Sequence, residues 1–97
     1  MPRVTIRLAE SALLDLAGIR DWCSEQRVPD VGKRFLNEIL ERIQTLRDHP
    51  TNGRVVPEVE QPTLRELIHP PFRIGYRVQG STVSIVRVWR SERLLQL

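Results

Sequence analysis

Apolar and polar residues alternate with a period of two in four segments of the chain. The first segment covers residues 4–8, and the other three cover residues 64–68, 72–78 and 83–89. Successive side chains of a strand point to opposite faces, so this period predicts four strands. The last segment is apolar on both faces for most of its length, which predicts that it lies centrally in a sheet.

Between the first and second of these segments, apolar residues are spaced by three and four, which predicts two amphipathic helices. The first stripe consists of Ala12, Leu16, Ile19 and Cys23, with Trp22 at its edge, and the second consists of Leu36, Ile39, Leu40, Ile43 and Leu46. Ser11 stands where it could cap the first helix. Pro29 separates the two helices, and Pro50 ends the second.

The element order β-α-α-β-β-β predicts an α+β domain of two layers. We expect a mainly antiparallel sheet with both N-terminal helices packed on one face. Along residues 72–78, one side carries Phe72, Ile74, Tyr76 and Val78, and the other carries Arg73, Gly75 and Arg77. We expect the first set to form the core. The arginine-bearing face is expected to be left for solvent or for a partner.

Length and composition are those of one small globular domain spanning residues 1–97. The chain is 40% hydrophobic and 28% charged, and no apolar run approaches the length of a membrane helix. Its single cysteine fits a reducing cytoplasm, where we expect the protein to be located. The possible ligands Cys23, His49 and His69 lack metal-site spacing, so no metal or cofactor is expected.

The chain is basic, with a formal net charge of +3 and a pI of about 10.0. Arginine accounts for 14 of its 15 basic residues. Arginine makes planar two-pronged contacts with carboxylates and phosphates, so this excess suggests an acidic partner, either nucleic acid or protein. A GC-rich genome that favours arginine codons would give the same excess of arginine over lysine. Both explanations, an acidic partner and codon usage, stay open.

A resemblance to a known family emerges when several short segments are taken together in order. They are Asp15-Leu16 with Trp22, then FLNEILERIQTLRDHP, GRVVPE, LRELI, FRIGYRV and VSIVRVWRSER. Together they resemble the RelE/ParE family of bacterial toxins over essentially the whole chain. The segment GRVVPE followed by RELI is more similar to the ParE branch. That branch inhibits DNA gyrase, whereas RelE-branch toxins cleave mRNA on the ribosome.

The residues needed for RNA cleavage are mostly missing from this sequence. Cleavage requires a base, cations on the phosphate and an acid for the leaving oxygen. Arg73 lies where RelE-like nucleases hold the scissile phosphate, but their two strand lysines fall near Leu64 and Glu66. Their C-terminal Tyr or His has no counterpart after Trp89. We therefore predict no catalytic residues and a chain that is not a nuclease.

The resemblance also implies protein partners. An acidic, mostly disordered antitoxin would wrap the toxin, and its expected contacts are Arg73, Arg77, Leu13 and Trp22. DNA gyrase would be bound by the C-terminal residues Arg90, Arg93, Leu94, Leu95 and Leu97. Arg65 is expected to orient the neighbouring loop. For Arg73 and Arg77, a merely solvated sheet face is the alternative.

Two other functions remain open at this point. One is a ribosome-dependent mRNA endonuclease that uses Arg73, Arg90 and a glutamate. The other is a non-toxic homologue whose role is plasmid stabilisation through complex formation. In every reading we expect a higher-order toxin–antitoxin complex, no membrane association, and no sequence-specific DNA binding by the toxin alone.

Overall fold

The computed structural model describes residues 3–91 of the chain. Its elements are β1 (Thr5–Leu8), α1 (Glu10–Glu25), α2 (Pro29–Gln44), a 3-10 turn η1 (Thr45–Arg47), β2 (Arg54–Val55), β3 (Leu64–His69), β4 (Phe72–Gln79) and β5 (Thr82–Arg90). The expected α+β fold with two N-terminal helices is confirmed. The two-residue strand β2 lies in a segment that the sequence predicts as a loop.

The five strands form one mixed sheet in the order β1-β5-β4-β3-β2. Strands β2 to β5 are antiparallel neighbours, whereas β1 pairs in parallel with β5. The hairpin between β4 and β5 turns at Gly80, whose φ of 59° lies in the left-handed region that glycine tolerates. As predicted, β5 lies inside the sheet, between β1 and β4.

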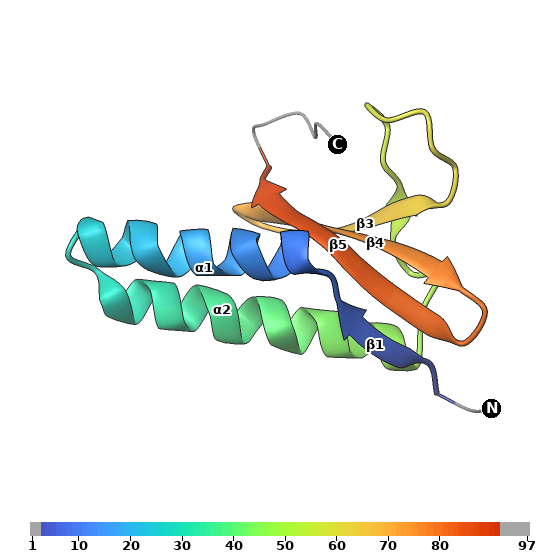
Figure 1. Ribbon diagram of the computed structural model, residues 1–97, viewed down its shortest axis with the longest axis horizontal. Helices are drawn as coiled ribbons and strands as arrows, with labels where there is room; N and C mark the ends of the chain where they lie inside the picture. The colour runs from blue at the N-terminus through green and yellow to red at the C-terminus, as the bar shows by residue number, and fades with distance from the viewer. Residues whose placement is uncertain (1–2, 92–97) are drawn as a thin grey trace.

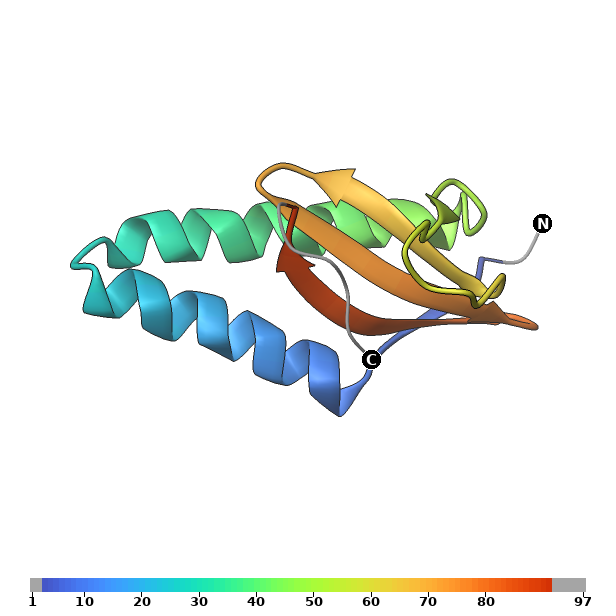
Figure 2. The same cartoon turned by 90° about the horizontal axis from the view of Figure 1, so that it is seen from above.

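The two helices form an antiparallel hairpin on one face of the sheet (Figures 1 and 2). Pro29 is the first residue of α2, where a missing N–H costs nothing. The apolar stripes of both helices pack on the sheet, and the core contains Ala12, Leu16, Ile39, Ile43 and Leu46 from the helical layer and Leu67, Phe72, Ile74, Tyr76, Val83, Ile85 and Val88 from the strands. Within residues 3–91, no helix has both the length and the apolar character to cross a membrane.

The second face of the sheet is covered, so the expectation that it is left open was wrong. The chain between β2 and β3 crosses this face, and Val56, Leu64 and Trp89 form a second apolar cluster there. Gly75 permits this packing, because a Cβ at that position would lie 2.9 Å from Cζ3 of Trp89. The glycine in mid-strand therefore marks a close approach by a ring from the neighbouring strand.

Candidate protein-binding site

Strand β5 changes neighbours halfway along its length. Its pairing with β1 ends where Leu8 pairs with Ile85. The next residue, Val86, has no partner in β4 and forms a β-bulge. Beyond this point α1 lies along the edge of β5. Such an edge exposes backbone donors and acceptors, which need partners if they are to be buried.

Two polar side chains of α1 supply these partners. Ser11 Oγ donates to the carbonyl of Val86 at 2.5 Å, and Asp15 Oδ2 accepts from the N–H of Val88 at 2.8 Å. Residues four apart share one face of a helix, so both reach the same strand. Ser11 was expected to cap α1. The helix instead begins at Glu10, and Ser11 lies inside it.

Asp15 also holds the guanidinium of Arg87. Nε of Arg87 donates to Oδ2 at 2.8 Å, and Nη2 donates to Oδ1 at 3.2 Å. This hydrogen-bonded contact with Asp15 raises the pKa of Arg87, although burial acts in the opposite direction. The carboxylate therefore binds a side chain and a backbone group of β5 together, and it fixes the spacing between α1 and that strand.

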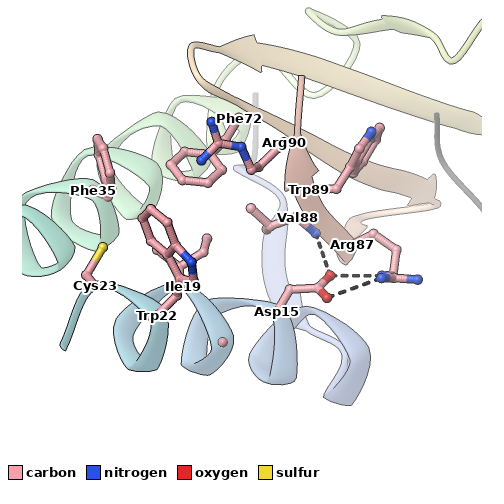
Figure 3. A pocket seen from close by; sticks show the side chains of 11 residues that line it. Asp15, Ile19, Trp22, Cys23, Phe35, Phe72, Arg87, Val88, Trp89 and Arg90 are labelled. Carbon is pink, nitrogen blue, oxygen red and sulfur yellow. Dashed lines mark hydrogen bonds and ion pairs between the residues drawn. The ribbon is translucent and has the colours of Figure 1, made fainter. Parts of the chain in front are cut away.

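A pocket of about 570 Å³ opens beyond this contact, between the two helices and the end of β5. Figure 3 shows Asp15, Ile19 and Trp22 of α1 on one side, with Val88 and Arg90 of β5 across from them. Further lining comes from Gly18, Cys23, Phe35, Phe72, Arg87 and Trp89. Phe35 and Phe72 meet edge to face, with ring centroids 5.2 Å apart. Apolar walls with a few charged groups are typical of a binding site.

Trp22 and Arg90 are the side chains of this pocket that would suit it to binding a protein. Trp22 is 52% exposed, which is unusual for so large an apolar side chain. Tryptophan and arginine are the residue types that most often dominate protein interfaces. Cys23 also lines the pocket but is buried, and no group of three metal-ligating side chains occurs within residues 3–91. The arrangement is suited to binding.

A buried charged cluster lies on the opposite face of the sheet. Arg73 is 6% exposed and donates from Nε to Oε1 of Glu66 at 2.6 Å. Its Nη1 and Nη2 donate to the two carboxylate oxygens of Glu58 at 2.8 and 2.7 Å. Arg54 Nε donates to the other oxygen of Glu66 at 2.7 Å. The hydrogen bonds that Arg73 donates to Glu58 are the largest influence on its pKa, and together with the contact to Glu66 they raise that pKa against the effect of burial.

The predicted antitoxin contacts lie in two regions of the structure, on the helices and on the sheet. Trp22 lines the pocket, and Leu13 is exposed on α1. Arg73 belongs to the buried cluster, and Arg77 is half-buried and donates to Gln61 of the loop before β3. Arg90, predicted to bind gyrase, lies in the same pocket as Trp22. The predicted gyrase contacts Arg93, Leu94, Leu95 and Leu97 lie outside the described residues.

The predicted role of Arg65 is confirmed. Its Nη1 donates to the carbonyl of Gly53 at 2.7 Å, and this contact holds the segment that leads into β2. The N–H of Gly53 donates to the hydroxyl of Tyr76 at 2.7 Å, so the same residue is held from both sides. Tyr76 is buried as predicted, and burial raises the pKa of its phenol.

Replacing Asp15 with alanine is expected to lower the free energy of unfolding by about 2 kcal/mol, because the N–H of Val88 and the Arg87 guanidinium lose their acceptor. Urea unfolding followed by circular dichroism measures the change. Asp15→Asn keeps an acceptor oxygen and should lose less. The control is Asp21→Ala, which removes an exposed carboxylate of α1 and should have little effect. Equal losses in Asp15→Ala and Asp21→Ala would contradict the role given to Asp15.

Solved structures with the same architecture define the class of protein. A chain of the chromosomal ParDE toxin–antitoxin system from P. aeruginosa superposes with a TM-score of 0.79 and 26% identity, covering 93% of this chain and 98% of that one. A chain of the RelBE2 toxin–antitoxin complex from Mycobacterium tuberculosis gives a TM-score of 0.69 and 23% identity, covering 96% and 97%. At that identity the second likeness concerns the fold alone.

Sequence comparison gives the family. The family model for the ParE toxin of the type II toxin–antitoxin system parDE matches residues 6–95. Toxin RelE2 of Caulobacter vibrioides is 36% identical over 84 residues, which make up 86% of this chain and 90% of that protein. The chain belongs to the ParE toxin family of type II toxin–antitoxin systems, and the resemblance read from its motifs is confirmed.

Proposed function

We propose that this chain is a toxin that inhibits DNA gyrase by direct binding, is not a nuclease, and is neutralised by an acidic antitoxin. The state of Arg73 carries the proposal. It is the arginine that resembles the phosphate-binding residue of RelE-like nucleases, yet two carboxylates bind its guanidinium. A guanidinium already neutralised by Glu58 and Glu66 is a poor site for a phosphate, because the ligand would meet two negative charges.

The two positions that resemble the nuclease lysines support the same conclusion. Leu64 is fully buried in the second apolar cluster. Glu66 is 1% exposed and lies between Arg54 and Arg73. Neither side chain supplies a cation, and neither reaches solvent where RNA would bind. The cluster has the composition of a structural ion-pair network.

Gyrase binding is proposed to begin at Arg90 and to continue through Arg93, Leu94, Leu95 and Leu97. Arg90, the member of this set that lies within the described residues, ends β5 and lines the pocket. The antitoxin is proposed to place an apolar side chain against Trp22 and an acidic one near Arg90. The two partners would then compete for one surface, so that neutralisation follows from occupancy of the pocket.

A second candidate function is mRNA cleavage on the ribosome. The observation that favours it is the 36% identity to a protein named toxin RelE2. It would need a route to Arg73 and a proton donor, and the buried cluster provides neither. We therefore place it second.

The test measures ATP-dependent supercoiling of relaxed plasmid by gyrase, with ribosome-dependent mRNA cleavage measured in parallel. We expect the purified chain to block supercoiling and leave mRNA intact. Arg90→Ala should require about tenfold more protein for the same inhibition, since arginine anchors of this kind contribute more than 1 kcal/mol. The matched control is Arg20→Ala, an exposed arginine of α1 outside the pocket, which should retain full inhibition.

Two results would overturn the proposal. Cut mRNA with unaffected gyrase would establish the nuclease reading. A chain without effect in either assay would be the non-toxic homologue. Equal inhibition by wild type and Arg90→Ala would remove Arg90 from the gyrase surface.

A further inference from the structure

The loop between β2 and β3 crosses the face of the sheet opposite the helices (Figures 1 and 2). We call residues 56–63 the strap. They form neither helix nor strand. The base of the strap is fixed, because Val56 is buried in the second apolar cluster and its N–H donates to the carbonyl of Leu64 at 3.1 Å. Farther along, the strap is joined to β4 by side chains, through Glu58 to Arg73 and Gln61 to Arg77.

The surface under the strap is positively charged. Three arginines gather there, namely Arg54, Arg73 and Arg77, against the two carboxylates Glu58 and Glu66. Glu66 belongs to β3 and bridges Arg54 and Arg73, so it stays with the sheet. Glu58 belongs to the strap. If the strap lifted, it would take one negative charge away from a buried guanidinium.

Glu58 is bound in the way that a carboxylate ligand is bound. Both of its oxygens accept from the two terminal nitrogens of Arg73, in the parallel two-pronged geometry that makes such pairs strong and specific. A further donor is present on the same face. Trp89 is 8% exposed, and among the described residues its indole N–H has no hydrogen-bond partner. A buried donor without a partner costs free energy. That free energy is regained when an acceptor binds the donor.

We propose that the guanidinium of Arg73, which lies over the Trp89 ring, is a binding site for a carboxylate of an acidic peptide, and that Glu58 occupies this site until the partner's carboxylate replaces it. The antitoxin as the source of that peptide rests on the proposed function. The site itself does not, because its residues and their geometry are those of this chain alone. The exchange keeps Arg73 paired throughout, so no buried charge is left uncompensated.

The geometry favours a carboxylate over a nucleic acid. The Arg73 guanidinium lies 4.8 Å from the centroid of the Trp89 ring, and Gly75 packs against the edge of that ring. A nucleotide base needs an open aromatic face for stacking, and this ring is buried. Glu66 remains beside Arg73 after the exchange and would repel a phosphate dianion more strongly than a single carboxylate.

The test uses the fluorescence of Trp89. The chain has two tryptophans, so Trp22→Phe leaves Trp89 as the sole emitter. This variant is titrated with hexaglutamate peptide, alone and combined with Glu58→Gln. Glutamine keeps the size of the side chain and removes its charge. The tethered Glu58 competes at high effective concentration, so its neutralisation is expected to tighten peptide binding by about tenfold or more.

Two variants serve as controls. Glu60→Gln removes the same charge from an exposed position of the strap and should change peptide binding by less than about twofold. Arg73→Lys keeps the positive charge but loses the two-pronged guanidinium. In the Glu58→Gln background it should abolish the tighter peptide binding. Glu58→Gln binding no tighter than Glu60→Gln would overturn the proposal. Tighter binding of inorganic phosphate or of a uridine hexanucleotide than of the peptide would also overturn it, and would identify a phosphate site.

A measurement on the unaltered chain tests the same exchange if Glu58→Gln folds poorly. The N–H of Val59 donates to the carbonyl of Val56 within the strap. Saturating hexaglutamate is expected to lift the strap and accelerate hydrogen exchange at Val59, while amides of β4 keep their protection. Unchanged or slower exchange at Val59 would refute the displacement. Neither measurement involves gyrase, so failure of the gyrase proposal would leave this one standing, and the reverse also holds.

Discussion

Gly53→Ala is expected to lower the free energy of unfolding by about 3 kcal/mol or more. A Cβ at this position would lie 2.5 Å from the carbonyl oxygen of Glu66 and 2.6 Å from the hydroxyl of Tyr76. The backbone has little freedom to move away, because the Gly53 N–H and carbonyl are bound by Tyr76 and Arg65. Overpacking costs about 1–3 kcal/mol, and losing the buried hydrogen bond adds about 1–3 kcal/mol.

Urea unfolding of wild type and variant measures this loss, with midpoint and slope compared. Gly18→Ala is the matched control. Gly18 lies in α1 with nothing within 4 Å of an added Cβ. Alanine is the better helix former by roughly 0.8–1 kcal/mol, so this variant should be slightly more stable than wild type. If Gly53→Ala stays within about 1 kcal/mol of wild type, the segment before β2 is looser than these contacts imply.

Arg73→Met is expected to cost about 3–5 kcal/mol, because it leaves buried carboxylates without their cation. Glu66 is most affected, since it would retain Arg54 alone, whose side chain is 61% exposed. Methionine fills similar space, so packing against Trp89 is largely kept. The double variant Arg73→Met with Glu66→Gln should recover part of the loss, since it removes the charge that Arg73 compensates.

The same denaturation experiment measures both variants. Arg20→Met provides the comparison, because Arg20 pairs with Asp21 at the surface and such pairs contribute about 0–1 kcal/mol. A double variant no more stable than Arg73→Met would show that the cost comes from lost packing. If Arg73→Met and Arg20→Met lowered the free energy of unfolding equally, the charged cluster would be far more hydrated than its burial indicates.

The layers of the fold could be predicted from periodicity. Spacings of three and four identified both helices, and period two identified four of the five strands. Two features could not be predicted in this way. The parallel pairing of Thr5 with Thr82 joins residues far apart in the chain, and nothing local encodes it. Strand β2 has two residues, too few to show a period.

The second face shows why sequence reasoning about charged residues can fail. Arginine is seldom buried without a partner, so alternating arginines predict a solvated face. The partner here is Glu58, 15 positions before Arg73 and in a segment without a regular pattern. One signal was present in the sequence. Gly75 in mid-strand indicates a close approach, and Trp89 proves to be the group that approaches.

The candidate site was only partly accessible to sequence reasoning. Trp22 and Arg90 were both singled out, but as parts of different surfaces, and only the fold brings them into one pocket. The roles of Ser11 and Asp15 were missed. A pair of short polar residues four apart on α1 was the available signal, but its meaning depends on the edge of β5 that it faces.

The parallel pairing of β1 with β5 has a consequence for synthesis on the ribosome. The partner of Thr5 is Thr82, so the first strand waits for almost the whole described chain to be made. At about 5–20 residues per second, this wait lasts on the order of 4–15 s. Both helices have been made by about halfway through that interval, when residue 44 is added, while strands β2 to β5 of the sheet that they cover are still missing. Until β5 is made, the apolar faces of both helices lack the surface that covers them in the folded protein, so the fold predicts exposed apolar helix faces on the nascent chain.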